Sequence, residues 1–309
     1  MPFTSDNLLV FLTVLDKGSF SAAARTLHRV PSAVSMAIAN LEAELGFALF
    51  DRKSREPVPT EKAKTLAPYA REIVDNLRQL NVFSHELTQG VESTLTIGVS
   101  TGVNPQKLFL ALHTINQRYP LMNVEIITAP QDDILPLLHQ NRIQLALVFG
   151  GLHVNPQEQI YCIGHESFIA TISSSHPSLS HQTSLYIEDL VQTRQIIIAS
   201  HHREPSDLRT QVATKYWRTD NFSMALGLVE AGMGWGNLPY TLIKEKLIDG
   251  SLKQLKFRNT KNGLVLPIHV VCLKGNALKR GAQECVELLQ QNLQPHHDEQ
   301  INAGPITIR

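Results

Sequence analysis

The sequence predicts an α/β protein in which a small helical unit and one long helix precede a larger region of alternating strands and helices. Three observations support this: two short helices joined by a tight turn at residues 20–45, a helical apolar stripe across residues 61–89, and strand and helix alternation from residue 94 onward. With 309 residues, 43% of them hydrophobic, the chain can bury sizeable cores and should divide into two or three domains.

The first predicted helix runs from Ser5 or Asp6 to Asp16, and either leading residue is suited to capping its free N–H groups. Gly18 follows, and glycine commonly ends a helix. The apolar stripe of this helix consists of Leu8, Phe11, Leu12 and Leu15. We therefore expect it to support the two helices that come next.

Residues 20–45 predict two short helices around a break at residues 28–30. Pro31 is suited to opening the second helix because its φ is already helical and its missing N–H would have no partner in the first turn. Spacings of four, three and four residues define the buried face of that helix, which consists of Val34, Ile38, Leu41 and Leu45. Such a pair can hold one helix in a DNA groove, although a pair that only buries its alanines in another globular protein also fits this stretch.

The opposite face of the second helix carries small and polar side chains, which allow close approach to another surface. No acidic residue occurs from Lys17 to Leu41, so nothing in this run repels phosphate. The candidate DNA-contacting residues of this region are Arg29, Pro31, Ser32, Ala33, Ser35, Met36 and Ala39.

A short basic hairpin is predicted at residues 49–60, LFDRKSREPVPT, where two prolines exclude helix. Arg52, Lys53 and Arg55 at its tip are candidates for contacting the DNA backbone, as the wing of a winged helix-turn-helix does. Elsewhere a charged hairpin would be a solvated turn. Its place directly behind the helix pair favours DNA binding.

The overall charge predicts no polyanion partner, because Lys plus Arg and Asp plus Glu number 28 each. Residues 1–92 hold 10 basic and 11 acidic residues, so DNA binding would depend on a local basic patch. The apolar run at residues 8–15 is too short to cross a bilayer, which predicts a cytoplasmic protein with no membrane partner. Three widely spaced cysteines are typical of a reducing compartment, and buried thiols explain them more simply than a redox switch: Cys162, Cys272 and Cys285.

Residues 61–89 predict one long helix with an apolar seam that alternates steps of four and three residues. The seam consists of Leu66, Ala70, Ile73, Leu77, Leu80, Ser84 and Leu87. Because the seam would be exposed on an isolated chain, we expect it to pair with the same helix of a second subunit; packing on the chain's own later domain is the alternative. Pro68 should kink this helix or mark its start.

Residues 90–93 are the expected hinge into a region of alternating strands and helices. The strands are expected at residues 95–99, 124–128, 144–149, 167–173, 195–199, 215–218 and 264–273, and the helices at 106–118, 132–141, 222–231 and 277–293. Such alternation makes a parallel sheet covered on both faces, and ligands bind beyond the carboxyl ends of its strands. The candidate ligand-binding residues at such ends are Ser100, Thr101, Gly102, Phe149, Ser200, His202 and Phe222.

Several of these segments together resemble the LysR-type transcriptional regulators. The matching segments are GSFSAAARTL and SAVSMAIANLEAELGFALFDR, with Phe11 before them and Thr60-Glu61 after them, and the resemblance continues to about residue 294. It implies a homotetrameric regulator, a dimer of dimers, whose small-molecule effector alters its binding to promoter DNA. Pro31, Met36 and Ala39 stand where many members carry glutamine or a basic residue.

The resemblance sets the expected domains: a winged helix-turn-helix at 1–60, a linker and dimerisation helix at 61–90, an effector-binding domain at 91–294 and a flexible tail at 295–309. The effector domain should resemble type 2 periplasmic binding proteins, with lobe I at about 93–162 and 268–294 and lobe II at about 163–267. Ser100 and Thr101 align with family positions that often contact effector.

The sequence of residues 219–247 is similar to that of the family branch that includes the Pseudomonas quinolone-signal receptor. This similarity implies a rather apolar pocket. Ile198, Phe222 and Trp235 are candidates to line it, and core packing explains the same residues equally well.

One rival interpretation is an enzyme. GVSTG at residues 98–102 satisfies the G-x-S-x-G pattern of hydrolase nucleophiles, and Asp220 and His269 are available to complete a triad with Ser100. Such an elbow needs several sheet strands before it, whereas only the helical N-terminal region and the hairpin precede this one. We therefore expect a protein that is not an enzyme.

His201 and His202 could bind an acidic group or a metal, but adjacent histidines on a surface loop usually bind neither. We expect no metal and no cofactor. A third class is an interaction protein that dimerises through the long helix and binds neither DNA nor ligand. It would show no salt-dependent retention on DNA.

Overall fold

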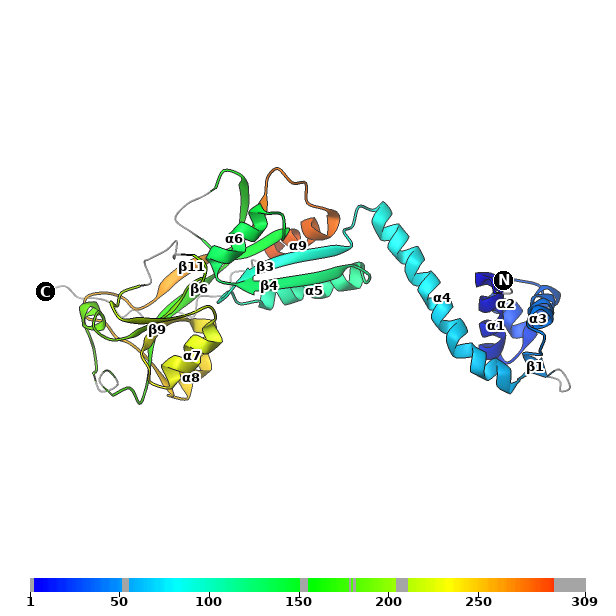
Figure 1. Cartoon of the computed structure of the whole chain (residues 1–309), viewed down its shortest axis with the longest axis horizontal. Coiled ribbons are helices and arrows are strands. Elements are labelled where there is room, and N and C mark those ends of the chain that lie inside the picture. Colours follow the sequence, from blue (N-terminus) through cyan, green and yellow to red (C-terminus); the bar gives the residue numbers. More distant parts are fainter. Residues whose placement is uncertain are drawn as a thin grey trace. The chain divides into compact units, whose positions relative to one another are not determined.

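The computed structural model describes residues 3–51, 56–150, 155–177, 179, 182–203 and 211–291. The chain divides into two compact units, Met1–Thr88 and Gln89–Arg309 (Figure 1). The predicted wing-tip residues Arg52, Lys53 and Arg55 and the predicted tail at 295–309 lie outside the described residues. No helix in the described ranges is long and apolar enough to span a membrane.

The first unit begins with α1 (Ser5–Lys17), α2 (Phe20–Thr26) and α3 (Pro31–Leu45). Thr4 caps α1, since its hydroxyl accepts a hydrogen bond from the N–H of Asn7 at 3.2 Å. We expected Ser5 or Asp6 in this role, but the capping residue is Thr4, directly before them. Gly18 ends α1 in a left-handed conformation with φ of 65°, as glycine readily does.

The apolar stripe of α3 packs against α1 and α2. Val34, Ile38 and Leu41 are fully buried in one core with Phe11, and Pro31 occupies the start of α3 as predicted. This burial fixes the rotation of α3 about its own axis. The face opposite the stripe is therefore turned to solvent.

A two-stranded hairpin and a long helix follow: β1 (Phe50–Asp51), β2 (Val58–Pro59) and α4 (Glu61–Thr88). The strands pair antiparallel. The carboxylate of Glu42 in α3 accepts hydrogen bonds from the N–H groups of Leu49 and Phe50 at 2.7 and 3.0 Å, which ties the start of the hairpin to α3. The first eight residues of α4 include Pro68, so this proline lies inside the helix and does not mark its start.

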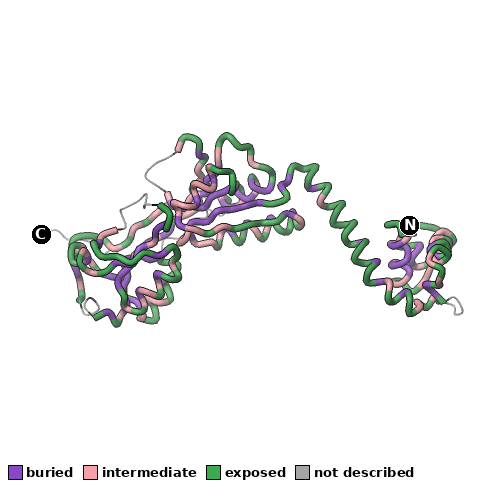
Figure 2. Tube along the Cα trace, in the orientation of Figure 1, coloured by how far each residue is buried: buried purple, intermediate pink, exposed green. Residues whose placement is uncertain are grey.

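The predicted seam of α4 is used in two ways. Ala70 is buried in the core of the first unit, so it is not available to a second subunit, contrary to our expectation. Beyond it the helix is mostly exposed (Figure 2), and the exposed apolar side chains include Ile73, Leu77, Leu80 and Leu87.

The second unit is built on a mixed nine-stranded sheet in the order β4-β3-β5-β11-β6-β9-β7-β8, with β10 pairing beside β6. Lobe I holds β3 (Thr94–Ser100), α5 (Gln106–Arg118), β4 (Asn123–Ala129), α6 (Gln131–His139), β5 (Leu145–Phe149) and α9 (Arg280–Gln291). β3 runs parallel to both neighbours. Along β5 the side chains alternate: Leu145, Leu147 and Phe149 share a core with α5 and α9, whereas Ala146 and Val148 pack with α6. Helices therefore cover both faces, as predicted.

Lobe II holds a 3-10 turn (Ile187–Leu190), β7 (Gln195–Ile198), β8 (Tyr216–Thr219), α7 (Phe222–Glu230), β9 (Trp235–Pro239), α8 (Tyr240–Ile248) and β10 (Leu252–Gln254). β7 runs parallel to β8 and β9. Ala225 and Val229 of α7 and Ile243 of α8 form a core with Ile196 of β7. Lobe II therefore has a hydrophobic core separate from those of lobe I.

Two long strands cross from one lobe to the other. β6 (Glu158–Ser173) and β11 (Leu264–Leu273) pair antiparallel along the whole of β11, with a shift of register between Ile268 and His269. β6 begins well before residue 167, where the sequence predicted its start. The prediction missed the first half of the strand because its burial is irregular and shows no clean alternation.

Candidate DNA-contacting face and effector cavity

The solvent face of α3 presents the residues that the sequence predicted. Pro31, Ser32, Met36 and Ala39 are exposed, with Met36 at 63%, and Ala33 and Ser35 are partly exposed. Because the buried stripe fixes the rotation of α3, these side chains form one surface of small and uncharged groups. Such a surface allows close approach to the edges of bases.

Arg29, the cation directly before α3, is engaged by a carboxylate of its own unit. Its guanidinium donates to both carboxylate oxygens of Asp6, with Nη1 to Oδ2 at 2.9 Å. The hydrogen bonds and charge of Arg29 lower the pKa of Asp6 below its ordinary value. A DNA phosphate would therefore compete with Asp6 for Arg29.

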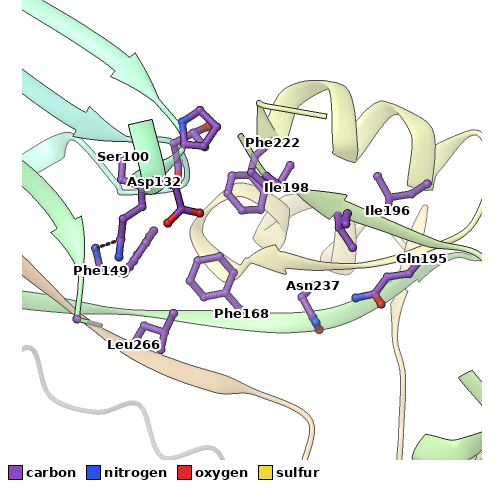
Figure 3. A pocket seen from close by; sticks show the side chains of 16 residues that line it. Ser100, Asp132, Phe149, Phe168, Gln195, Ile196, Ile198, Phe222, Asn237 and Leu266 are labelled. Carbon is purple, nitrogen blue, oxygen red and sulfur yellow. Dashed lines mark hydrogen bonds between the residues drawn. The ribbon is translucent and has the colours of Figure 1, made fainter. Parts of the chain in front are cut away.

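A cavity of about 150 Å³ lies between the two lobes of the second unit (Figure 3). The residues that line it are Ser100, Thr101, Pro130, Gln131, Asp132, Phe149, Gly150, Phe168, Gln195, Ile196, Ile197, Ile198, Ala199, Phe222, Asn237 and Leu266. Among the predicted residues, this set includes Ser100, Thr101, Phe149, Ile198 and Phe222. Most of these predicted residues lie at the carboxyl ends of β3, β5 and β7. Parallel sheets place their ligand sites at such ends.

Three phenylalanine rings dominate the apolar wall. The rings of Phe149 and Phe168 meet edge to face with centroids 5.1 Å apart, and the rings of Phe168 and Phe222 lie 5.8 Å apart. Asn221 caps α7 through a 2.8 Å hydrogen bond from the N–H of Met224, and this places Phe222 at the first position of the helix. The wall therefore combines side chains of both lobes.

The polar groups around the cavity are held by the backbone. The side-chain oxygen of Gln131 accepts a hydrogen bond from the N–H of Phe149 at 2.8 Å. The side-chain oxygen of Gln195 accepts from the N–H groups of Val212 and Ala213 at 2.9 and 3.1 Å. These contacts fix both amides, so their positions do not depend on a bound molecule.

Two predicted residues join the lobes instead of lining the cavity. Ser200, which is fully buried, donates from its hydroxyl to Oδ1 of Asp133 in α6 at 2.7 Å. Gly102 lies against Phe222, and a Cβ built on Gly102 would lie 2.9 Å from Cδ2 of that ring and closer still to Cε2. Each contact connects lobe I to lobe II beside the cavity.

Trp235 and His202 lie elsewhere, which corrects our expectation for both. Trp235 is buried in the core of lobe II, where its indole N–H donates to the carbonyl of Thr193 at 3.2 Å. His202 has an exposed side chain, and its backbone N–H donates to the hydroxyl of Ser200 at 2.9 Å. Trp235 is the first residue of β9, and the sequence pattern did not show which side chains of this strand face the core of lobe II.

The sequence missed lining residues that become neighbours only through the sheet order. They include Gln131 and Asp132 at the start of α6, Phe168 and Leu266 on the crossing strands, and Asn237 on β9. The one available signal was the start of α6 directly after β4, since helix N-termini meet the same sheet edge.

The described residues contain no group of three or more His, Cys, Asp or Glu side chains placed to hold a metal ion. Cys272 and Cys285 are buried, and burial raises the pKa of Cys285 to about 12, with the charge of Glu92 adding to the effect. Cys162 is exposed.

Comparison with known families agrees with this geometry. Residues 5–64 match the bacterial regulatory helix-turn-helix protein of the lysR family, and residues 88–294 match the LysR substrate binding domain. The chain therefore belongs to the LysR family: it is a DNA-binding transcriptional regulator with an effector-binding domain. Proteins of this family are regulators, not enzymes; they bind promoter DNA and small-molecule effectors and form oligomers.

Individual relatives carry similar names. The chain is 38% identical to the HTH-type transcriptional regulator AceR of Acinetobacter baumannii over 245 residues, which cover 79% of this chain and 82% of AceR. It is 27% identical over 300 residues to the multiple virulence factor regulator MvfR of Pseudomonas aeruginosa, the quinolone-signal receptor, with 96% and 89% of the two chains covered. The resemblance to that branch of the family is thereby confirmed.

Solved structures share the fold. CbnR, a LysR family transcriptional regulator, superposes with a TM-score of 0.52 at 18% identity, over 93% of this chain and all of that one. A variant of OxyR from Corynebacterium glutamicum superposes with a TM-score of 0.51 at 20% identity, over 94% and 91% of the two chains. These likenesses support the architecture of a helix-turn-helix unit with a two-lobed α/β unit.

Proposed function

We propose that this regulator reads promoter DNA with the solvent face of α3 and senses a small molecule in the cavity between its lobes. The observation that carries the first part is the uncharged surface of the exposed Ser32, Met36 and Ala39 and the partly exposed Ser35, on a helix of fixed rotation. Arg29 and three residues of the wing, Arg52, Lys53 and Arg55, supply phosphate contacts. For the wing residues this role rests on the sequence pattern alone. Such a regulator works in the cytoplasm.

The side chains that read the DNA are few and small, so specificity depends on close approach and on the shape of the duplex. We expect Ser32→Ala and Ser35→Ala to change the ranking of promoter sequences by about 1–3 kcal/mol at the positions they contact. Selection of genomic fragments by the purified parent and variants tests this, with Thr65→Ala, an exposed hydroxyl on α4, as control. Unchanged rankings in both serine variants would reject the assignment of the face.

Two exposed apolar surfaces support assembly as a dimer of dimers. One is the stripe of Ile73, Leu77, Leu80 and Leu87 on α4. The other lies on lobe I, where β4 is an edge strand and α5 lies beside it, and it consists of Phe109, Leu110, Val124 and Ile126. Each surface groups several exposed apolar side chains, whereas a monomer's surface usually carries them singly. Two different self-contacts suffice to build a tetramer from dimers.

Charge substitutions on the two surfaces separate the two contacts. We expect Leu80→Lys to abolish pairing through α4 and Ile126→Lys to abolish pairing through lobe I, so that each variant stops at a dimer and the double variant at a monomer. Sedimentation velocity measures these states. A parent that sediments as a monomer would reject the assembly.

For regulation, effector binding changes the closure of the lobes and thereby the arrangement of the paired DNA-binding units. The contacts Ser200–Asp133 and Gly102–Phe222 support this mechanism, because both join the lobes next to the cavity. A DNA footprint that is identical with and without saturating effector would contradict it.

A further inference from the structure

β8 is the edge strand of the sheet in lobe II, and its one neighbour among the described strands is β7, which runs parallel to it. The N–H of Gln195 in β7 donates to the carbonyl of Lys215 at 3.0 Å. Because the residues of a parallel strand direct their backbone groups alternately to one side and the other, those of Tyr216 and Arg218 point away from the sheet. Two residues of β8 therefore offer N–H and C=O groups to an added strand.

The side chains of this edge are more aromatic than an unused edge requires. Tyr216 is 46% exposed and Trp217 is 42% exposed. Proteins commonly protect edge strands with charged residues, and exposed apolar groups on such a strand favour association. The guanidinium of Arg194 lies over the ring of Trp217, with its central carbon 4.3 Å from the ring centroid. This contact holds a cation and an aromatic surface side by side at the edge.

The charge of this edge is positive. Lys215 directly precedes β8, Arg218 belongs to it, and Arg194 lies beside it; all three are exposed. Nothing acidic occurs from residue 211 to residue 219. Like charges that face each other across paired strands repel, so two copies of this edge disfavour one another. A strand that carries carboxylates is attracted instead.

The neighbouring carboxylates have partners of their own. Asp220, directly after β8, lies 3.8 Å from the ring of His201. The carboxylate of Glu188 accepts hydrogen bonds from the side-chain amide of Asn259 at 2.9 and 3.1 Å, and that of Asp189 accepts from a backbone N–H of its own turn at 2.9 Å. The cations of the β8 edge form no ion pair with these carboxylates, so their charge is available to a partner.

We propose that β8 is the docking site of a partner protein that adds an extended acidic segment to the sheet as a further strand. The outward backbone groups of Tyr216 and Arg218 form the main-chain hydrogen bonds. Arg194, Lys215 and Arg218 bind the carboxylates of the segment, since a guanidinium can donate to both oxygens of a carboxylate. Trp217 gives the segment an apolar contact. Neither α3 nor the cavity takes part in this contact.

Two labelled nonapeptides test the charge: EEVTVTVEE and KKVTVTVKK. Their charged ends match Lys215 and Arg218 at the two ends of β8 in either direction of the added strand. Fluorescence anisotropy with the full-length protein should show the acidic peptide binding at least roughly tenfold more tightly than the basic one. Equal affinities, a preference for the basic peptide, or no binding of either would overturn the inference.

Backbone methylation tests whether the acidic peptide pairs as a strand. One variant of EEVTVTVEE carries N-methyl groups on its three valines and the other on its two threonines. Because alternate residues of an added strand face β8, one variant should bind roughly tenfold more weakly than the parent peptide and the other about equally. Equal affinities of all three peptides would show that charge alone attracts the segment, and would reject strand addition.

Charge reversal tests the residues. Lys215→Glu with Arg218→Glu should lose the acidic peptide and gain roughly tenfold in affinity for the basic one, a gain that damage to the fold would not produce. Lys244→Glu with Lys256→Glu is the matched control, because both lysines are exposed in lobe II and lie outside β8. A reversal of peptide preference in the control, or none in the β8 variant, would reject the edge as the site.

Two other occupants are outcomes of the same measurements. Displacement of the acidic peptide by an oligonucleotide, or loss of promoter retention in the β8 variant with unchanged urea unfolding, would assign the edge to DNA and overturn the inference. A lower oligomeric state of that variant in sedimentation velocity would assign the edge to a second copy of the chain and overturn it as well. Promoter retention and oligomeric state equal to those of the parent, with the peptide preference reversed, support the acidic partner.

Discussion

The DNA-contacting face and the cavity are built in opposite ways. The face comes from consecutive residues of one helix, and a buried stripe on the same helix, Val34, Ile38 and Leu41, fixes its orientation. The cavity is gathered from residues as far apart as Ser100 and Leu266, and its shape depends on two lobes staying together. Changes inside lobe contacts should therefore alter the cavity and leave α3 intact, and changes near α3 should do the reverse.

The largest expected effect comes from Gly102→Ala. Gly102 has φ of 89°, and an added Cβ would overlap the ring of Phe222 across the lobes. Backbone strain and overpacking together should destabilise the second unit by about 2–4 kcal/mol. Both tryptophans of the chain, Trp217 and Trp235, lie in this unit, so urea unfolding followed by tryptophan fluorescence reports on it alone.

Gly227→Ala is the matched control. Gly227 lies inside α7, and nothing stands within 4 Å of an added Cβ. Alanine should stabilise the helix by about 0.5–1 kcal/mol. A second variant, Gly102→Ala with Phe222→Ala, should recover the part of the loss due to overlap. If Gly102→Ala costs as much stability in a Phe222→Ala background as in the parent, the contact between Gly102 and Phe222 does not exist in solution.

A smaller effect is expected from Ser200→Ala. The substitution removes the 2.7 Å hydrogen bond to the part-buried carboxylate of Asp133, and with it the acceptor of the N–H groups of His202 and Arg203. Hydrogen bonds to charged groups contribute about 1.5–3 kcal/mol, so the second unit should lose stability in that range and the lobes should open more readily. Urea unfolding of the full chain, followed by tryptophan fluorescence, measures this loss of stability.

Ser251→Ala serves as control for Ser200→Ala. The hydroxyl of Ser251 donates to the carbonyl of Lys246 within lobe II, at 3.3 Å, and joins nothing across the lobes. It should cost under about 1 kcal/mol. If urea unfolding shows equal losses of stability in both serine variants, Ser200 has no special part in holding the lobes together.

The two sites also differ in how far the sequence predicted them. Helical spacing identified the exposed side of α3 because neighbours on a helix are neighbours in the sequence. Strand ends placed Ser100, Thr101 and Phe149 at the cavity for a similar local reason. Trp235 was misplaced, and Phe168 and Leu266 were missed, because β6, β11 and β9 meet only through a sheet order that no local pattern encodes.

Acid should separate the two units by a different physical cause. In the second unit, burial lowers the pKa of His176 and of His269 below their ordinary value of 6.5, and the charge of His165 adds to the shift of His269. The unfolded chain then binds more protons, so stability is complete above pH 6.5 and falls as the pH drops below it. In the first unit, hydrogen bonds from Arg29 and Arg71 lower the pKa of Asp6 and of Asp16 below 3.8.

For those carboxylates the sign is the same but the pH range lies lower: their contribution is fully present above pH 3.8 and is lost only as the pH falls through the lowered pKa values. Between pH 6.5 and 4.5 the second unit should therefore weaken while the first does not. Tryptophan fluorescence follows the second unit, and retention on DNA follows the first. A double variant, His176→Gln with His269→Gln, should flatten the response, and an unchanged slope would assign it to other groups.

The smallest effect is expected from Asp6→Asn, and it concerns the face alone. Asp6 holds the guanidinium of Arg29 directly before α3, so its removal frees that cation for a DNA phosphate. The dependence of DNA affinity on salt should steepen by about one unit in a plot of log K against log salt concentration. Asp16→Asn is the matched control, because Asp16 forms the same kind of pair with Arg71 on α4. If both variants change the salt dependence equally, the gain reflects lost negative charge in general, and Arg29 does not contact the phosphate backbone. If only Asp6→Asn steepens it, Arg29 lies at the DNA, and the orientation that the buried stripe of α3 imposes is the orientation used in binding.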